Sequence, residues 1–225
     1  MAALFARPGA VLFDLDGTLA DTAPDLAGAL NALRLQRGLA PLPVEALRPY
    51  ASAGARGLLG AGLDLRPEHA EYEAHRVAFL DLYEQMLDRD SRLFDGIEPL
   101  LSALEDRGIP WGVVTNKSQR FTPRVVAGLG LDRRASVVVS GDTTPHAKPH
   151  PAPLLHACAQ IGVEPAAAIY VGDDLRDVQA ARAAGMPAVA AAYGYLGEAG
   201  EVASWGADAV IQQPAALLGL IDWRD

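Results

Sequence analysis

The feature that most constrains this chain is an alternation of short apolar runs with helical segments, seen near residue 10 and again after residue 91. Several of the apolar runs are uninterrupted, which is typical of strands covered on both faces of a sheet. Most of the helical segments end just before a glycine, a residue that readily ends a helix. The pattern predicts a parallel, doubly wound α/β sheet. The predicted strands are Ala10–Leu15, Trp111–Thr115, Val137–Ser140, Ala168–Gly172, Pro187–Ala191 and Asp208–Ile211.

The alternation stops between about Thr22 and Arg89, where helical patterns follow one another without a convincing strand. We expect helices at Pro24–Gln36, Val44–Tyr50, Ala55–Leu63 and within Pro67–Asp88. Because this segment comes directly after the first strand, it predicts a helical insert that lies over the end of that strand.

Composition excludes several classes of protein. Half of the residues are hydrophobic and 21% are charged, which is typical of a chain that folds around its own core. The net charge of −9 argues against a nucleic-acid or anionic-membrane partner, so an anionic substrate would need a metal ion or a few placed cations. The single cysteine, Cys158, cannot form an intrachain disulfide, and we find no targeting signal or membrane span. We expect a cytoplasmic protein.

Two carboxylates, Asp14 and Asp16, follow the first predicted strand in the sequence Asp-Leu-Asp-Gly. Residues two apart in an extended chain point to the same face, so both would lie at the strand's carboxyl end, where open α/β sheets bind ligands. Carboxylates this close repel each other unless a cation bridges them or one holds a proton. One can then be a nucleophile beside a metal and the other a proton donor to a leaving group. An Asx turn that ends the strand is the competing interpretation.

A second acidic group, Asp173, Asp174 and Asp177, follows the predicted strand Ala168–Gly172 and begins a helix. Carboxylates at a strand end are hard oxygen ligands of the kind that Mg²⁺ binds, with water and substrate phosphate completing its coordination. Aspartates also favour the first turn of a helix because they complement its dipole. Three acidic residues within five positions exceed what capping requires, so a metal site is the favoured interpretation.

Polar residues also follow the predicted strand at Trp111–Thr115 and occupy a later loop. Thr115 and Asn116 could bind phosphate together with free backbone N–H groups, although for these residues taken alone an N-cap or turn role is the favoured interpretation. Lys148 precedes Pro149, and a rigidly placed ammonium there could neutralise a nucleophile and a phosphate oxygen. A solvated surface charge is the alternative.

The order of these features resembles the haloacid dehalogenase superfamily of phosphohydrolases over essentially the whole chain. All four signature motifs of that family are present, namely DLDGTLADT at 14–22, VVTNK at 113–117, KP at 148–149 and VGDDLRD at 171–177. The resemblance implies an α/β fold with a Rossmann-like parallel-sheet core and an inserted helical-bundle cap. We therefore expect the core at residues 1–20 and 91–225 and the cap at residues 21–90.

The resemblance also implies catalytic roles. Asp14 would be the nucleophile that forms an aspartyl-phosphate, and Asp16 would be the general acid and then the general base. Thr115 would bind the transferring phosphoryl group, and Lys148 would hold the charges of Asp14 and the phosphate.

The same resemblance implies the binding residues. Substrate contacts are expected from Gly17, Thr18 and Asn116. The implied cofactor is Mg²⁺, held by the Asp14 carboxylate, the Asp16 backbone carbonyl and Asp173, with Asp177 or Asp174 acting through water or hydrogen bonds around the metal. Many relatives have Ser or Thr at the position of Asp174, and whether Asp174 or Asp177 contacts the metal directly stays open.

Shorter motifs resemble particular branches of the family. SAGAR at 52–56 and YGY at 193–195 resemble the phosphoglycolate phosphatase-like branch, while WGVVTNK at 111–117 and WGADAV at 205–210 resemble bacterial N-acetylmuramic acid 6-phosphate phosphatases. The substrates of both carry a carboxylate. We expect Arg56 of the insert to bind that carboxylate as a bidentate pair, with a surface pair to a glutamate as the alternative.

We therefore expect a Mg²⁺-dependent phosphomonoesterase that acts on a small carboxylated phosphate monoester such as 2-phosphoglycolate, as a monomer or homodimer. An N-acetylmuramic acid 6-phosphate phosphatase in cell-wall recycling and a sugar phosphomutase would use the same core residues. A dehalogenase is disfavoured because those relatives lack the second carboxylate, present here as Asp16. A phosphorylated receiver module is disfavoured because it has no large helical insert. An inactive binding module is disfavoured because it would most simply have lost a motif residue, and Asp14, Asp16, Lys148 and Asp173 are all retained.

Overall fold

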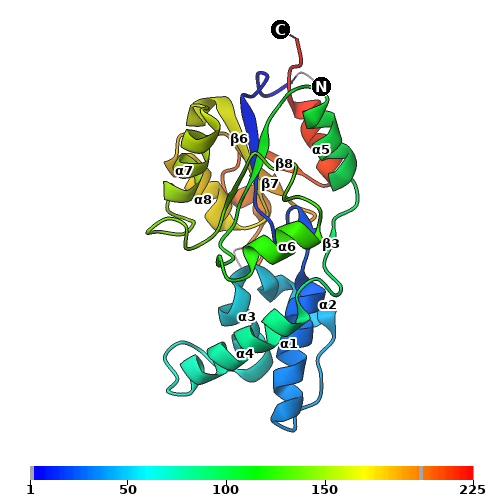
Figure 1. The fold of residues 1–225 in the computed structure, drawn as a ribbon. Helices are drawn as coiled ribbons and strands as arrows, with labels where there is room; N and C mark the ends of the chain where they lie inside the picture. The colour runs from blue at the N-terminus through cyan, green and yellow to red at the C-terminus, as the bar shows by residue number, and fades with distance from the viewer. Residues whose placement is uncertain (1–2, 198–199, 225) are drawn as a thin grey trace.

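The computed structural model describes residues 3–197 and 200–224, in which helices cover both faces of a central sheet (Figure 1). Among these residues the sheet has six parallel strands in the order β5-β4-β1-β6-β7-β8. They are β1 (Ala10–Phe13), β4 (Trp111–Val114), β5 (Val137–Val139), β6 (Ala168–Gly172), β7 (Ala188–Ala191) and β8 (Ala209–Ile211). The predicted doubly wound α/β fold is confirmed. Because the chain builds outward first on one side of β1 and then on the other, β1 lies at the topological switch point, where such sheets bind ligands.

The continuous apolar strands arise because both faces of the sheet are buried. In β1, Val11 and Phe13 pack into one hydrophobic cluster, whereas Ala10 and Leu12 pack into the other. The first cluster includes residues of α5 (Ile97–Glu105), α6 (Thr122–Gly128) and the 3₁₀ helix η4 (Pro214–Leu220). The second includes residues of α7 (Ala152–Ile161) and α8 (Leu175–Ala183). Alternate residues of β1 therefore pack against opposite layers of helices.

The insert after β1 is helical, as expected. It contains α1 (Ala23–Gln36), α2 (Val44–Leu47), the 3₁₀ helix η1 (Arg48–Ala53), α3 (Gly54–Leu63) and α4 (Tyr72–Met86). We call these helices the cap. They lie below the core in Figure 1, on the side toward which the carboxyl ends of the parallel strands point.

Two short strands, β2 (Ala20–Asp21) and β3 (Arg92–Leu93), pair antiparallel where the chain leaves and re-enters the core. Strands of two residues are too short to produce an alternating pattern, so the sequence did not predict them. The division of the chain after residues 20 and 90 stays a prediction.

Other differences from the predicted elements concern helix ends. The predicted helix Val44–Tyr50 is divided, because α2 gives way to η1 just before Pro49, which has no backbone N–H for an α-helical bond. The helix expected within Pro67–Asp88 begins only at Tyr72. No helix in the described part of the chain is long and apolar enough to cross a membrane.

Candidate active site

The candidate site lies at the carboxyl ends of three neighbouring strands. Asp14 directly follows β1, Thr115 follows β4 and Asp173 follows β6. Because the strands are parallel, their ends meet at one edge of the sheet although they are far apart in the sequence. A cavity of about 380 Å³ lies between this edge and the cap, lined by Asp14, Asp16 and Thr115 on the core side.

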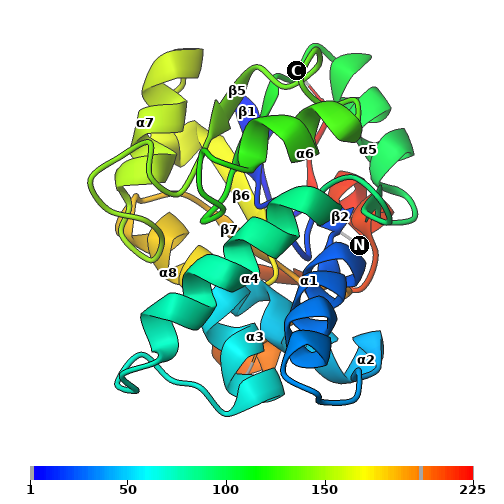
Figure 2. The ribbon, with the colours of Figure 1, turned by 60° about the horizontal axis from the view of Figure 1, so that its bottom comes forward.

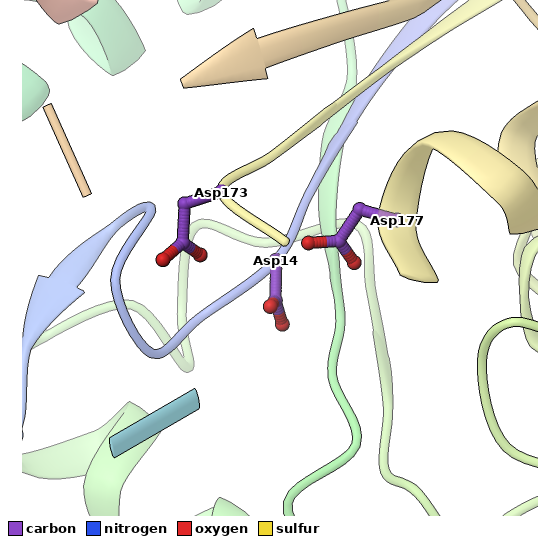
Figure 3. Close-up of side chains that lie close together, drawn as sticks. All are labelled: Asp14, Asp173 and Asp177. Carbon is purple, nitrogen blue, oxygen red and sulfur yellow. The ribbon is translucent and has the colours of Figure 1, made fainter. Parts of the chain in front are cut away.

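Three buried carboxylates form a cluster at this edge. Asp14, Asp173 and Asp177 each place an oxygen so that all three atoms lie within 4.8 Å of one another. Figure 3 shows the three side chains gathered from the segment after β1, the turn after β6 and the first turn of α8. This set of hard oxygen donors fits a divalent cation such as Mg²⁺.

Among the described residues, Lys148 is the cation that forms ion pairs with this cluster. Its Nζ lies 2.9 Å from Asp14 Oδ1 and 2.7 Å from Asp177 Oδ1, and it also donates to the Val114 carbonyl and the Tyr170 hydroxyl. The residue is only 4% exposed. Burial acts to lower the pKa of Lys148, but the two carboxylates outweigh burial and raise it, so the ammonium form persists.

The cluster carries more negative charge than Lys148 can balance. Burial raises the pKa of Asp14 to about 7, although Lys148 acts in the opposite direction. Burial also raises the pKa of Asp173 well above its usual range, and repulsion from Asp14 and Asp177 adds to the effect. These shifts mean that the protein alone stabilises the ionised carboxylates poorly. A bound divalent cation would stabilise them by balancing their negative charge.

Asp173 is oriented by donors from three parts of the chain. Thr18 Oγ1 donates to Asp173 Oδ1 at 3.0 Å, and the Tyr195 backbone N–H donates to Oδ2 at 2.8 Å. Ser52 of the cap donates to the same Oδ2 at 3.3 Å. The Thr18 hydroxyl therefore supports a carboxylate of the cluster, and its contact with the substrate stays a prediction.

Asp16 lies outside the carboxylate cluster and makes contacts of its own. Its Oδ1 accepts a short hydrogen bond from Thr22 and lies 3.1 Å from Lys117 Nζ. Lys117 also donates to the Tyr83 hydroxyl of α4 at 2.8 Å, so this lysine joins Asp16 to the cap. Lys117 is part of a motif in the sequence, but the motif alone predicted no role for it. Tyr83 was missed because nothing in a helical pattern marks it as facing the core.

The residues after β4 have distinct positions. Thr115 Oγ1 accepts a hydrogen bond from the Lys117 backbone N–H at 3.1 Å, which leaves the Thr115 hydroxyl proton available for a ligand. Asn116 also lines the cavity, but its side chain bonds both the carbonyl and the N–H of Lys148, at 2.9 and 3.0 Å. Asn116 therefore holds the loop that carries the lysine.

Asp174 has a structural position beside the cluster. Its side chain accepts from the Arg176 N–H, and the Asp177 side chain accepts from the Asp174 N–H, which forms a capping box at the start of α8. Asp174 also receives two hydrogen bonds from the Arg176 guanidinium, which binds the Ser52 carbonyl of the cap as well. Within the described residues, Asp177 rather than Asp174 belongs to the carboxylate cluster.

Arg56 lies away from the carboxylates. It is exposed on α3 and lines a neighbouring cavity of about 900 Å³, whereas the described lining of the smaller cavity does not include it. The expectation that Arg56 binds the substrate therefore stays a prediction without geometric support. Arg76 of α4 does line the cavity that contains Asp14 and Asp16.

Relatives in sequence agree with this site. The family model of the haloacid dehalogenase-like hydrolases matches residues 8–185. A phosphoglycolate phosphatase of Xanthomonas campestris is 44% identical over 216 residues, which cover 96% of this chain and 97% of the relative. An N-acetylmuramic acid 6-phosphate phosphatase of Pseudomonas aeruginosa is 42% identical over 216 residues, with 96% of each chain covered.

Solved structures agree with the fold. A crystal structure described as a predicted phosphoglycolate phosphatase from Haemophilus somnus is similar with a TM-score of 0.83 and 28% identity, and covers 95% of this chain and 98% of its own. The match of the family model to most of the chain, together with relatives that are similar over almost their full length, confirms the resemblance in the motifs. The chain belongs to the haloacid dehalogenase-like hydrolases and is a phosphatase of their phosphoglycolate phosphatase-like branch.

Proposed function

We propose that the protein is a Mg²⁺-dependent phosphomonoesterase that transfers the phosphoryl group of its substrate to Asp14 and then to water. The observation that carries this proposal is the position of Asp14, which lies at the end of the central strand within a carboxylate cluster and forms an ion pair with Lys148.

Asp14 is the nucleophile in this proposal. Lys148 and the Leu15 backbone N–H both contact Asp14 Oδ1, at 2.9 and 2.7 Å, and within the described chain no hydrogen bond is made to Oδ2. Oδ2 is thus the oxygen free to attack phosphorus. As the Oδ2–P bond forms, the P–O bond to the leaving group breaks, which gives an aspartyl-phosphate and an alcohol.

Asp16 supplies and then removes a proton. In the first step its carboxylic acid protonates the leaving oxygen, and in the second its carboxylate takes a proton from the water that attacks the aspartyl-phosphate. The second step releases inorganic phosphate and regenerates Asp14. Asp14 and Asp16 line the same cavity, which supports this division of labour.

The phosphoryl oxygens need donors and positive charge. Thr115 is proposed to donate its free hydroxyl proton to them, and Lys148 to balance charge on Asp14 as the phosphoryl group arrives. Gly17, Thr18 and Asn116 stay predictions as direct substrate contacts, since Thr18 and Asn116 use their side chains on Asp173 and Lys148.

The metal ligands are proposed to be Asp14, Asp173, Asp177 and the Asp16 backbone carbonyl. A bound Mg²⁺ would neutralise charge on the phosphoryl oxygens and hold them for in-line attack. The surplus negative charge of the buried cluster supports this choice, because nearby cations other than Lys148 are bound to other acids.

The Asp14→Asn variant tests the proposal. An amide has nearly the shape of the carboxylate but is a poor nucleophile, so we expect hydrolysis of p-nitrophenyl phosphate to fall by several orders of magnitude while the circular dichroism spectrum is retained. Acid-quenched wild type given labelled substrate should carry a phosphate that hydroxylamine removes. Hydrolysis by a folded Asp14→Asn protein at the wild-type rate would contradict the covalent mechanism.

The relatives' names support a carboxylated phosphate monoester as the substrate, since 2-phosphoglycolate and N-acetylmuramic acid 6-phosphate both carry a carboxylate. The cytoplasmic location and the choice between monomer and homodimer stay predictions.

A further inference from the structure

We propose that Arg76 of α4 binds an anionic group at the far end of the substrate, so that the substrate is a carboxylated sugar phosphate rather than the two-carbon 2-phosphoglycolate. This inference rests on the proposed phosphatase function and names the substrate class of the same cavity.

One face of α4 forms a wall of the active-site cavity. Arg76, Phe79, Leu80 and Tyr83 all line the cavity that contains Asp14 and Asp16. Their spacing of three, four and seven residues places them on one side of the helix. Figure 2, which brings the cap toward the viewer, shows α4 crossing in front of the central strands.

Tyr83 marks the end of this face that lies nearest the chemistry. Its hydroxyl accepts a hydrogen bond from Lys117 at 2.8 Å, and Lys117 lies 3.1 Å from Asp16. Arg76 lies seven residues before Tyr83, which corresponds to about 10 Å along the helix axis. Along α4, Arg76 is therefore about two helical turns from the residue that contacts Lys117, which favours a ligand that extends along this helix from its phosphate.

The part of the face between these ends is apolar. Leu80 lies between Tyr83 and Arg76 and is partly exposed, while the neighbouring Phe79 and Leu26 of α1 also line the cavity but are buried. This apolar stretch fits ring carbons and methyl groups, and it offers no charge to a substrate that ends in a carboxylate close to its phosphate.

Arg76 is also the most available cation of the cavity. Its described partner is Glu73, three residues earlier on the same helix, and the Glu73 side chain is 65% exposed. Such surface pairs contribute little free energy, so a substrate carboxylate can replace Glu73. Lys117 is bound to Asp16 with only 6% of its side chain exposed, and Arg176 donates both to Asp174 and to the Ser52 carbonyl.

These positions select the ligand by its length. In 2-phosphoglycolate one methylene group and one ester oxygen separate the carboxylate carbon from phosphorus, so its two anionic groups cannot lie two helical turns apart. A hexosamine 6-phosphate with a carboxyl-bearing ether on C3 carries its anionic groups on substituents of C3 and C5, so several more bonds separate them than in 2-phosphoglycolate. N-acetylmuramic acid 6-phosphate, named in one relative, has this arrangement.

The experiment compares three substrates with matched variants. Wild type, Arg76→Met and Arg56→Met are assayed on N-acetylmuramic acid 6-phosphate, on N-acetylglucosamine 6-phosphate, which lacks the lactyl ether and its carboxylate, and on 2-phosphoglycolate. We expect wild type to prefer the first substrate. Arg76→Met should lower kcat/KM for N-acetylmuramic acid 6-phosphate by about 10- to 100-fold, mainly through KM. It should change kcat/KM for N-acetylglucosamine 6-phosphate, which has no carboxylate, far less. The Arg56→Met variant should not produce this selective loss.

A further variant separates binding from folding. Glu73→Gln removes the competitor for Arg76, so KM for the carboxylated sugar phosphate should fall, which a merely structural arginine would not cause. The inference would be overturned if Arg76→Met lost activity equally on both sugar phosphates, or if wild type preferred 2-phosphoglycolate. A loss of activity in Arg56→Met that is selective for the carboxylated sugar phosphate would also overturn it. A wild-type protein that hydrolyses none of the three substrates would overturn the proposed function and this inference with it.

Discussion

Gly17 brings the backbone after β1 against the side chain of Asp173. Its φ of +86° lies in the left-handed region, and a Cβ at this position would overlap the Asp173 carboxylate. Any side chain here therefore strains the backbone and also displaces a proposed metal ligand. The sequence expectation of a substrate contact missed this packing role, because only the folded chain brings residue 173 next to residue 17.

We predict that Gly17→Ala lowers the free energy of unfolding by about 1–3 kcal/mol and weakens Mg²⁺ binding by about 10- to 100-fold. Gly38→Ala is the matched control, since Gly38 has a φ of +71° and open space around its Cβ position. It should lose stability from backbone strain without a change in Mg²⁺ affinity. Denaturant unfolding and metal titration of activity measure the two effects. Unchanged Mg²⁺ affinity in Gly17→Ala would argue against Asp173 as a ligand.

At the scale of elements, the start of α8 combines helix capping with the site. Asp177 Oδ2 accepts the Asp174 N–H at 3.0 Å, while Asp177 Oδ1 lies 2.7 Å from Lys148 Nζ. The first turn of this helix thus orients a carboxylate of the cluster. The sequence allowed both helix capping and metal binding for the acidic residues, and the structure divides the roles: Asp174 caps the helix, and Asp177 both caps it and joins the cluster.

We predict that Asp174→Ala costs about 1 kcal/mol of stability, since alanine cannot accept the Arg176 backbone N–H. Asp174→Asn keeps an N-cap acceptor and loses only the ion pair with the partly exposed Arg176, so it should be less destabilising. Urea unfolding of both variants gives the comparison. Equal destabilisation would mean that the ion pair, rather than the cap, is the main contribution.

At the scale of the whole molecule, the active site depends on segments from both the core and the cap. Ser52 contacts Asp173, Tyr83 contacts Lys117, and the Tyr195 hydroxyl accepts from the backbone N–H groups of Thr22 and Ala23 where the cap begins. A ligand that neutralises the carboxylate cluster should therefore stabilise the fold as a unit.

We predict that Mg²⁺ at about 100 times its Kd raises the free energy of unfolding by about 2.7 kcal/mol. Asp173→Asn should remove most of this increase. Without metal, the same variant should unfold at a higher temperature than wild type, because it removes a buried carboxylate that Asp14 and Asp177 repel. Thermal unfolding with and without Mg²⁺ measures both effects. If Mg²⁺ raised the unfolding temperatures of wild type and Asp173→Asn equally, the ion would bind elsewhere.

The sequence by itself determined the fold class and the residues of the strand ends. Short continuous apolar runs that alternate with helical segments are typical of parallel strands buried on both faces, and such strands end at one edge, so Asp14, Thr115 and Asp173 were predictable neighbours. The motifs also indicated the family, which the relatives confirmed.

Only the tertiary structure decided which cap residues face the site. The helical pattern of residues 72–86 indicates that one face of the helix is buried, but it does not indicate which part of the protein packs against that face. The Lys117 contact with Tyr83 and the position of Arg76 at the cavity arise from docking between segments that are distant in the sequence. The same docking left Arg56 at a different cavity. Local periodicity sets which elements form, whereas the packing of cap against core sets which of their side chains meet the substrate.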